Sequence, residues 1–378
     1  MVARLRVLLV TDWYPDDATG SAGSFVRQQA LAVARDHEVC VLHLRGRRQA
    51  ERRLRLEEES DGPLRVLRVR HGFPPMPRTA VGVLAVAAAL RRLGRRPDIL
   101  HAHEFGAGFA AVVLGRLVRR PVVISEHSSE FALGGIDGAA AWVARRAFAA
   151  ADLVCPVSES LRAQLEQGGW GGRYEVVPNV IDTERFTPGS VVESPPRVVA
   201  VAAMRPVKGV ADLVEAVGLV AGRRADFRVE LAGDGPLLAP LQDRARARGL
   251  DERLSFRGAL ARDEVAALMR GAAFAVVPSR WETFSVVLGE AMACGLPVVA
   301  TAVGGMPERI HASNGIVCPP RDPAALAAAF ERMLDEHHRY DRRAIAAELR
   351  ERLSPEAMAR RWTAIYRQVA AGARRAVS

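Results

Sequence analysis

Short runs of branched apolar residues alternate with longer alanine-rich segments along most of the chain. Residues 5–10, LRVLLV, are apolar at nearly every position, which is typical of a strand covered on both faces of a parallel sheet. Residues 25–34 are long enough for a helix, and residues 38–44 return to the strand pattern. This alternation predicts an α/β fold built from doubly wound sheets.

The same pattern runs through both halves of the chain. In the first half it predicts further strands at residues 65–69, 99–102, 121–125, 153–156 and 175–177, with helices at 80–93, 107–117, 139–149 and 158–167. In the second half it predicts strands at 198–202, 228–232, 254–257, 273–277, 297–300 and 315–317, with helices at 210–221, 237–248, 262–271, 286–294, 306–310 and 323–336. Two such sets indicate two Rossmann-like domains.

The domain boundaries follow from a segment rich in Pro, Gly and Ser at residues 187–196, which we interpret as a linker. We therefore expect one domain over residues 1–185 and a second over 186–354. A C-terminal helix in residues 355–378 starts with a Ser-Pro pair typical of a helix N-cap and first position, and we expect it to pack back on the first domain. Because ligands of such folds bind at the carboxyl ends of strands, the two domains are expected to face a deep cleft.

Composition places the chain among soluble proteins, with 49% hydrophobic and 25% charged residues. No apolar run has the length of a membrane span, and the N-terminus, which contains Arg4 and Arg6, does not have the pattern of a secretion signal. The cysteines are far apart and lie mostly in apolar runs, as expected for buried thiols in a reducing compartment: Cys40, Cys155, Cys294 and Cys318. A cytoplasmic location is the prediction.

The net charge of +10 suggests nucleic acid or an anionic membrane as a partner. Residues 1–182 hold 25 basic and 20 acidic side chains, and residues 183–378 hold 28 and 23, so no basic domain stands apart. Aromatic residues are only 6%, which argues against a nucleic-acid module. Residues 45–55 carry six arginines before acidic residues 57–61; we expect a solvated loop and helix face there, with peripheral contact to the inner face of a membrane as the alternative.

Lys208 is the only lysine, because the other 52 of the 53 basic residues are arginine. A compact ammonium on a flexible stem differs physically from a planar guanidinium. By itself this composition is only suggestive of a role for Lys208.

The most informative segment is residues 277–308, VPSRWETFSVVLGEAMACGLPVVATAVGGMPE. Its pattern predicts a strand, a loop with Glu282, a helix that Ser285 can cap, and a second strand and loop. The amides at the start of such a helix suit a phosphate, and Glu290, one turn in, leans back toward them. The two carboxylates would then flank one ligand, accepting hydrogen bonds from sugar and ribose hydroxyls; two ordinary surface acids are the alternative.

This segment resembles the signature of family 4 of the retaining glycosyltransferases, which have the GT-B fold. The matching residues are Pro278, Ser279, Glu282, Phe284, Glu290, Ala291, Ala293, Gly295, Pro297, Val298, Val299, Gly304, Gly305, Pro307 and Glu308. The resemblance continues through Asn314, Gly315 and residues 319–322 and runs through essentially the entire chain.

The resemblance implies roles for the residues of this segment. Glu290 would bind the ribose of the donor, and Glu282 would bind hydroxyls of the transferred sugar. Backbone amides at Phe284, Ser285 and Val286 would hold sugar and phosphate. Thr283 and Ser285 replace the usual glycines of this loop, so its shape is expected to differ somewhat.

The resemblance also implies donor contacts in the earlier part of the second domain. Lys208 matches the family lysine that neutralises the donor pyrophosphate, whereas the family arginine is Ala203 here. Arg205 is the expected substitute, with a simply solvated side chain as the alternative. Arg257 and Gly258 match the place where the nucleotide base lies against backbone. Residues 231–236 match a turn that could border the donor, although a tight strand–helix turn explains their glycines equally well.

In the first domain, residues 19–29 place glycines between the first strand and a helix, so that Gly23 would let backbone approach phosphate or acceptor; a flexible loop is the alternative. His127 matches a family histidine near the transferred sugar. His101 and His103 also end a strand and are interpreted as lining or core, and Asn179 begins a match to the hinge segment of the family.

Together these matches predict a retaining hexosyltransferase that moves sugar from a nucleoside-diphosphate sugar, such as a UDP-sugar, to a hydroxyl of a glycan, glycolipid or natural-product core. No Asp-x-Asp motif or metal-ligand cluster occurs in the sequence, and we expect neither a metal nor another cofactor. A nucleotide-sugar 2-epimerase, a phosphorylase-like enzyme and a non-catalytic protein that binds sugars or lipid surfaces are the alternatives.

Overall fold

The computed structural model describes residues 4–16, 23–44, 54–71, 78–189 and 195–375. The chain forms two compact units, the first made of Met1–Val180 with Pro355–Ser378 and the second of Ile181–Ser354. Each unit is described by itself. Among the described residues, no helix has the length and apolar character required to cross a membrane.

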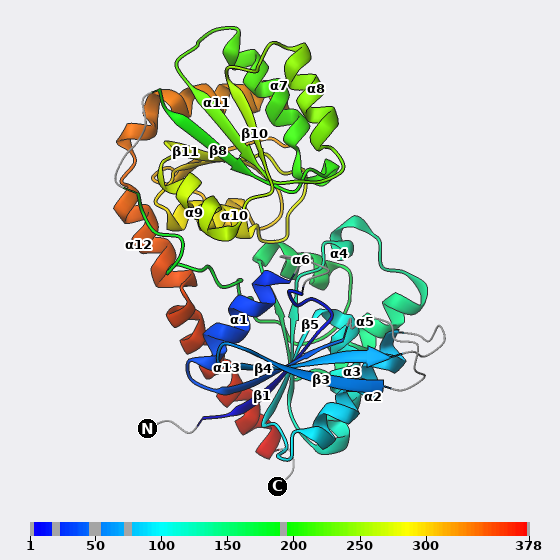
Figure 1. The fold of residues 1–378 in the computed structure, drawn as a ribbon. Helices are drawn as coiled ribbons and strands as arrows, with labels where there is room; N and C mark the ends of the chain where they lie inside the picture. Colours follow the sequence, from blue (N-terminus) through cyan, green and yellow to red (C-terminus); the bar gives the residue numbers. More distant parts are fainter. Residues whose placement is uncertain (1–3, 17–22, 45–53, 72–77, 190–194, 376–378) are drawn as a thin grey trace. The chain divides into compact units, whose positions relative to one another are not determined.

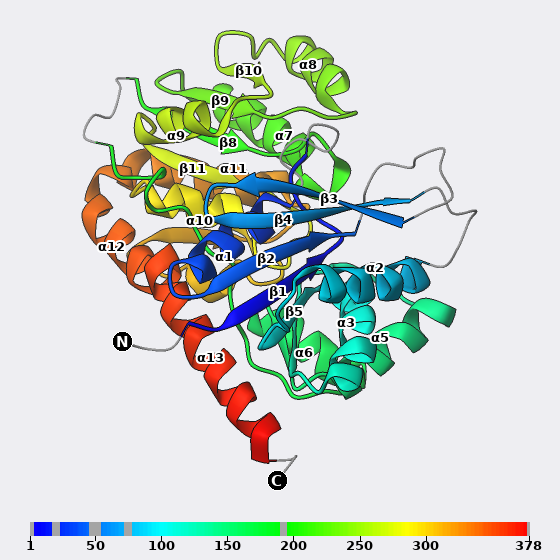
Figure 2. The same ribbon diagram turned by 60° about the horizontal axis from the view of Figure 1, so that its bottom comes forward.

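The first unit holds a seven-stranded sheet in the order β3-β4-β2-β1-β5-β6-β7. Its strands are β1 Arg6–Thr11, β2 Glu38–His43, β3 Leu54–Asp61, β4 Leu64–His71, β5 Ile99–His103, β6 Val122–Glu126 and β7 Leu153–Pro156. Its helices are α1 Ser24–Ala34, α2 Arg78–Arg92, α3 Glu104–Val118, α4 Glu130–Leu133, α5 Gly138–Ala150, α6 Glu159–Gln167 and α13 Pro355–Arg375. α2, α3 and α5 lie side by side on one face of this sheet (Figure 2), and α1 packs with α13 (Figure 1).

The edge strand β3 was not predicted from the sequence. Residues 57–61 form part of an antiparallel strand paired with β4, whereas we had expected a loop and helix face. The acidic strand is stabilised by ion pairs across the hairpin, including Glu58–Arg65 at 2.7 Å and Glu59–Arg68 at 2.6 Å. Opposite charges on neighbouring strands replace the apolar alternation that normally identifies a strand, which explains the error. The expected arginine-rich loop at residues 45–53 lies outside the described residues.

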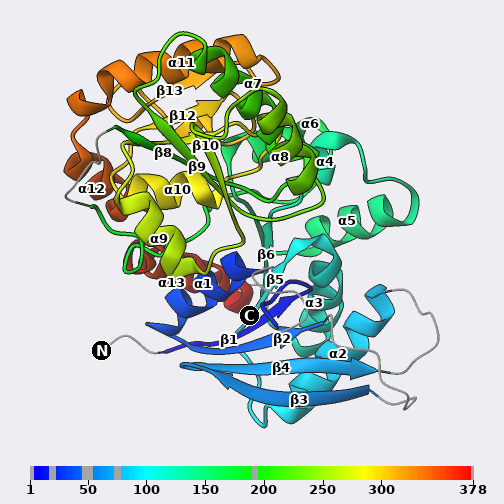
Figure 3. The same cartoon turned by 45° about the horizontal axis from the view of Figure 1, so that its top comes forward.

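The second unit holds a six-stranded parallel sheet in the order β10-β9-β8-β11-β12-β13 (Figure 3). Its strands are β8 Arg197–Val201, β9 Arg228–Ala232, β10 Leu254–Gly258, β11 Phe274–Val277, β12 Val298–Thr301 and β13 Gly315–Cys318. Its helices are α7 Val210–Ala221, α8 Leu238–Ala247, α9 Arg262–Arg270, α10 Val286–Ala293, α11 Pro323–Glu336 and α12 Arg342–Leu353, with 3-10 turns η1 Pro206–Lys208, η2 Pro307–Arg309 and η3 His337–Arg339. Phe227 and Phe274 pack against Phe330 of α11 in its core.

Further differences from the predicted elements are small, among them the four-residue helix α4, which the sequence pattern does not predict. The predicted strand at residues 175–177 is absent, and only an isolated bridge joins Val154 to Tyr174. The predicted helix at 306–310 is the short 3-10 turn η2. Helix α12 was not predicted, because its arginine-rich sequence has few apolar positions to mark a buried face.

Helix α13 is part of the core of the first unit although it follows the second unit in sequence. Trp362 and Tyr366 are fully buried, and the Tyr366 hydroxyl lies 2.6 Å from His101 Nδ1 at the end of β5. His37 Nε2 lies 2.9 Å from Thr363 Oγ1. The helix therefore contributes both apolar area and buried hydrogen bonds to the first unit.

The fold predicts that replacing Trp362 with alanine lowers the free energy of unfolding by about 3–5 kcal/mol, because a fully buried aromatic side chain leaves a cavity. Urea unfolding followed by circular dichroism measures the change. The exposed Gln368→Ala variant on the same helix is the control and should change stability by less than about 0.5 kcal/mol. Equal stabilities of the two variants would contradict the placement of α13.

Candidate functional site

The carboxyl edge of the parallel sheet in the second unit brings together the loops after β8 and β11. Gly209 has a left-handed backbone, and a Cβ there would lie 1.9 Å from the Pro278 carbonyl oxygen, so only glycine permits this approach. The Arg280 amide donates to the Val207 carbonyl at 2.8 Å. Arg280 also forms two hydrogen bonds to Asp212 at the start of α7, at 2.6 and 2.8 Å. The two loops are therefore held together by backbone and side-chain contacts.

Lys208 and Glu282, predicted to share a ligand, are in direct contact. The Lys208 ammonium lies 2.6 Å from Glu282 Oε1, and the Ser279 hydroxyl donates to the same oxygen at 3.1 Å. Lys208 keeps 30% of its side-chain surface exposed and Glu282 keeps 12%. A partly exposed ammonium at the carboxyl edge of a sheet can exchange this carboxylate for a ligand phosphate.

Glu290 forms a separate ion pair. It is 4% exposed on α10, and Arg262 Nη2 at the start of α9 lies 2.8 Å from its Oε1. Burial raises the pKa of Glu290, whereas the charge and hydrogen bond of Arg262 act to lower it. Arg262 also lies over the Phe186 ring, 5.3 Å from its centroid. Arg262 begins a predicted helix but belongs to no motif, so the sequence alone does not mark it as a site residue.

The loop between Glu282 and α10 is strained, as expected from the replacement of its usual glycines by Thr283 and Ser285. Ser285 adopts φ of 64°, a left-handed conformation that costs a residue with a side chain about 1–2 kcal/mol. Its hydroxyl accepts a hydrogen bond from the Leu288 amide at 3.4 Å and so caps the helix. Gly304 after β12 packs directly against this loop. Only glycine allows this close contact, because a Cβ at Gly304 would lie 1.6 Å from the Glu282 carbonyl oxygen.

Arg309 stabilises this strained loop from behind, a role that the sequence analysis missed. It is 8% exposed, with its guanidinium carbon 3.9 Å from the centroid of the Phe284 ring. Both of its terminal nitrogens donate to the Ser285 carbonyl at 3.3 Å. Burial lowers the pKa of Arg309 to about 10, so it stays charged at neutral pH. The family motif ends at Glu308, one residue earlier, and gave no signal for Arg309.

Of the remaining donor-site predictions in the second unit, Arg205 contacts Lys208 through the backbone, because its carbonyl accepts from the Lys208 amide at 3.0 Å. Arg205 and Arg257 are exposed, and within the described ranges no hydrogen bond or ion pair holds the Arg205 side chain. Gly258 has a left-handed backbone, and its carbonyl accepts from the Gly233 amide at 2.7 Å. A Cβ at Gly233 would lie 1.9 Å from the Ala202 carbonyl oxygen, which fits the tight-turn explanation of this segment.

In the first unit, Gly23 and His127 lie at the carboxyl edge of the sheet. Gly23 starts α1 with φ of 81°, and a Cβ there would lie 2.5 Å from the Trp13 carbonyl carbon. His127 Nε2 lies 3.0 Å from His103 Nδ1, and the two rings are stacked. Burial lowers the pKa of His127 to about 3, so its imidazole is neutral. Its Nδ1 has no hydrogen-bond partner among the described residues.

Two buried groups beside His127 organise this edge. His101, interpreted as lining or core, lies between the Tyr366 hydroxyl and the Ser125 hydroxyl, 2.9 Å away, which identifies it as core. Glu126 accepts three backbone hydrogen bonds, from the amides of Phe105, His127 and Ser128, at 2.8–3.0 Å. Burial raises the pKa of Glu126 to about 8 although these hydrogen bonds favour its charged form.

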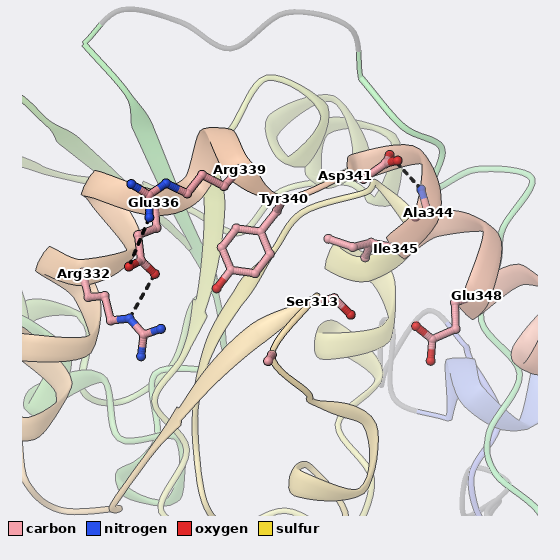
Figure 4. Close-up of a pocket in the computed structure, with 10 residues that line it drawn as sticks. Ser313, Arg332, Glu336, Arg339, Tyr340, Asp341, Ala344, Ile345 and Glu348 are labelled. Atoms are coloured by element: carbon pink, nitrogen blue, oxygen red, sulfur yellow. Dashed lines mark hydrogen bonds and ion pairs between the residues drawn. The ribbon is translucent and has the colours of Figure 1, made fainter.

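A cavity of about 350 Å³ lies elsewhere in the second unit (Figure 4). It opens between η3, α12 and the segment before β13, and Tyr340 projects into it beside Ser313 (Figure 4). Arg332 Nε on its rim lies 3.0 Å from Glu336 Oε2. None of the predicted site residues lines this cavity. Throughout the described ranges, no cluster of His, Cys, Asp and Glu is arranged to hold a metal ion.

Comparison with known proteins agrees with the resemblance. Residues 22–185 match the family model described as Glycosyltransferase Family 4, and residues 195–336 match the one described as Glycosyl transferases group 1. Glycogen synthase of Mycobacterium tuberculosis (strain CDC 1551 / Oshkosh) is 30% identical over 383 residues, which cover 93% of this chain and 91% of that protein. The chain belongs to the family 4 glycosyltransferases.

Solved structures share the fold. Sucrose-phosphate synthase from Thermosynechococcus elongatus has a TM-score of 0.79 at 22% identity, with 98% of this chain and 100% of that chain covered. HepE from Anabaena in complex with UDP has a TM-score of 0.75 at 18% identity, with 96% and 100% covered. The predicted GT-B architecture of two α/β domains is confirmed.

The contacts of Arg309 predict that Arg309→Met raises the KM for the sugar donor by about tenfold, because the Ser285 carbonyl loses its charged donors, worth about 1.5–3 kcal/mol. Adding Ser285→Gly should restore part of the loss, since glycine adopts the left-handed conformation freely and serves almost as well at an N-cap. Steady-state kinetics of the two single variants and the double variant measure this coupling.

Arg342→Met is the matched control. Arg342 also donates to backbone carbonyls, those of Ala272, Arg270 and Cys294, so its loss should lower stability and leave donor KM unchanged. If Arg309→Met and Arg342→Met had the same effect on donor KM, or if Ser285→Gly rescued nothing, Arg309 would have no positioning role.

Proposed function

We propose that this glycosyltransferase moves a hexose from a nucleoside-diphosphate sugar to an acceptor hydroxyl with retention of anomeric configuration. The observation that carries the proposal is the contact of Lys208 with Glu282 at the carboxyl edge of the second unit. A lone ammonium and a carboxylate at that edge fit a ligand with both phosphate oxygens and sugar hydroxyls. UDP-glucose is the first donor to test, because HepE has been solved with UDP and with UDP-glucose.

The donor would bind by exchange of existing contacts. The donor pyrophosphate replaces Glu282 as the ion-pair partner of the Lys208 ammonium. The released Glu282 carboxylate then accepts hydrogen bonds from sugar hydroxyls. The amides of Phe284, Ser285 and Val286 lie at the start of α10, where the helix dipole favours an anion. Glu290 would accept from the ribose hydroxyls. Arg205, Arg257 and Gly258 complete the proposed donor site.

The chemical step needs charge stabilisation on the departing nucleoside diphosphate. As the glycosidic bond breaks, negative charge grows on the β-phosphate, and the Lys208 ammonium together with the α10 amides stabilises it. The acceptor hydroxyl forms the new bond from the same face and passes its proton to a donor phosphate oxygen. Because the protein supplies positive charge from Lys208 and α10, we propose that the reaction needs no divalent metal or other cofactor.

His127 in the first unit is proposed to bind the transferred sugar as a neutral group. Its low pKa makes it a poor proton carrier at neutral pH, but its unpartnered Nδ1 can form a hydrogen bond to a hydroxyl. Gly23 is proposed to let a phosphate or an acceptor approach the backbone at the start of α1, in addition to accommodating the Trp13 carbonyl.

This assignment predicts that Lys208→Ala lowers kcat by about a hundredfold or more, the usual cost of removing one stabilising group from a transition state. Thermal shift with UDP-, GDP-, ADP- and TDP-sugars first identifies the donor, and product analysis then measures transfer and anomeric configuration. Arg205→Ala in the same assay tests whether Arg205 assists.

Arg223→Ala is the control, because Arg223 lies beyond the end of α7 in an exposed ion pair with Glu331 and should leave kcat unchanged. Normal transfer by Lys208→Ala would overturn the donor assignment. Release of an epimerised nucleotide sugar from donor alone would instead identify a 2-epimerase.

A further inference from the structure

The layer formed by α2, α3 and α5 exposes large apolar side chains on its outer face. Leu84 of α2 is 45% exposed, Val113 and Leu117 of α3 are 40% and 76% exposed, and Trp142 of α5 is 53% exposed. They are half of the exposed large hydrophobic side chains in the described part of the chain. Exposed apolar residues gathered on one layer indicate a binding surface.

The same layer is basic and almost free of carboxylates. Residues 78–120 and 138–150 contain ten arginines: Arg78, Arg91, Arg92, Arg95, Arg96, Arg116, Arg119, Arg120, Arg145 and Arg146. Their only acidic residues are Asp98 and Glu104. Asp98 pairs with Arg6 at 3.1 Å, and Glu104 accepts from the Trp13 indole at 2.9 Å, so neither neutralises the outer face. We call the exposed apolar and arginine side chains of residues 79–120 and 138–150 the helix-layer face.

The second unit shows what an ordinary arginine-rich surface of this protein looks like. Leu219 on α7 is 41% exposed, but the arginines that follow it are paired. Arg223 lies 2.6 Å from Glu331, and Arg224 lies 2.7 Å from Asp226. On the helix-layer face, Arg92 lies 3.2 Å from Glu58 of β3, but Arg91 and Arg116 are exposed and form no ion pair with any described residue. The composition of the whole chain therefore does not explain the uncompensated charge of this face.

Trp142 combines both properties of the face. Its ring packs against Phe109 of α3, 5.6 Å between centroids, and the Arg146 guanidinium lies 5.6 Å from the ring centroid. An indole beside an arginine suits the boundary between lipid headgroups and acyl chains, where the ring enters the apolar layer and the guanidinium reaches phosphate.

We propose that the helix-layer face docks the first unit on an anionic lipid bilayer. Exposed apolar side chains supply the hydrophobic part of such binding, and unpaired arginines supply attraction to acidic headgroups. A second copy of the chain is a poor occupant, because a symmetric contact would place arginines against arginines. A bilayer instead complements both the charge and the apolar surface.

The topology places the arginine-rich end of the helix-layer face away from the candidate site of the first unit. α2 precedes β5 and α3 precedes β6, so the arginines at the ends of both helices, Arg91 and Arg116 among them, lie near the amino edge of the sheet. Gly23 and His127 lie at the opposite, carboxyl edge. The arginines at the ends of α2 and α3 are therefore remote from these residues, whereas Trp142, near the start of α5, lies toward the carboxyl edge.

The test is cosedimentation of the full chain with vesicles of phosphatidylcholine containing about one third phosphatidylglycerol, compared with phosphatidylcholine alone. We expect partition to be at least about tenfold stronger on the anionic vesicles and to fall at high salt. Leu117→Ser with Trp142→Ser, and separately Arg116→Glu with Arg146→Glu, should each reduce partition about tenfold.

Leu219→Ser with Arg223→Glu is the matched control from the second unit and should bind vesicles like the native chain. Equal binding by all variants, equal binding to neutral vesicles, or no binding to either would overturn the proposal. Light scattering tests the competing occupant: a native dimer that the Leu117→Ser, Trp142→Ser variant dissociates would identify the face as an interface between copies and overturn the membrane assignment. These measurements need no donor or acceptor, so their outcome is independent of the proposed reaction.

Discussion

Close backbone contact between three loops is the constraint on which the candidate site depends. The loop with Lys208 lies against the end of β11 because Gly209 has no side chain, and the loop after β12 lies against Glu282 because Gly304 has none. These contacts place an ammonium, a carboxylate and the first turn of α10 in one small region. Any larger residue at either glycine would force the loops apart, and Lys208 would then lose its partner.

Opposite charges within this region are paired before any ligand arrives. Lys208 holds Glu282 and Arg262 holds Glu290, so neither carboxylate is left as an isolated charge, which would be costly at low exposure. A nucleotide sugar can exchange for these contacts because its phosphates and hydroxyls offer equivalent partners. Arg309 differs, since its role is to keep the Ser285 carbonyl and the Phe284 ring in place behind the loop.

The sequence predicted most of the fold because each buried strand of a parallel sheet is a short continuous run of apolar residues. Two motif matches also predicted that Lys208 and Glu282 serve one ligand, whereas their direct contact was found only in the structure. The sequence pattern missed the β3 hairpin, where Glu58 and Arg65 replace the apolar alternation, and it missed Arg309, whose partners Phe284 and Ser285 are far from it in sequence. Contacts between charged residues of distant segments produce no regular spacing of residues along the sequence. They are therefore seen only in the folded structure.

The unique lysine makes the central claim directly measurable. Labelling with ¹³C-lysine gives side-chain signals from Lys208 alone, since the sequence contains no other lysine. If the Lys208 ammonium binds the donor pyrophosphate, titration with the nucleoside diphosphate should shift the signal of the carbon next to the ammonium in a saturable way, whereas the free sugar should not. A signal that stays unchanged while the nucleotide saturates the protein by thermal shift would contradict the account.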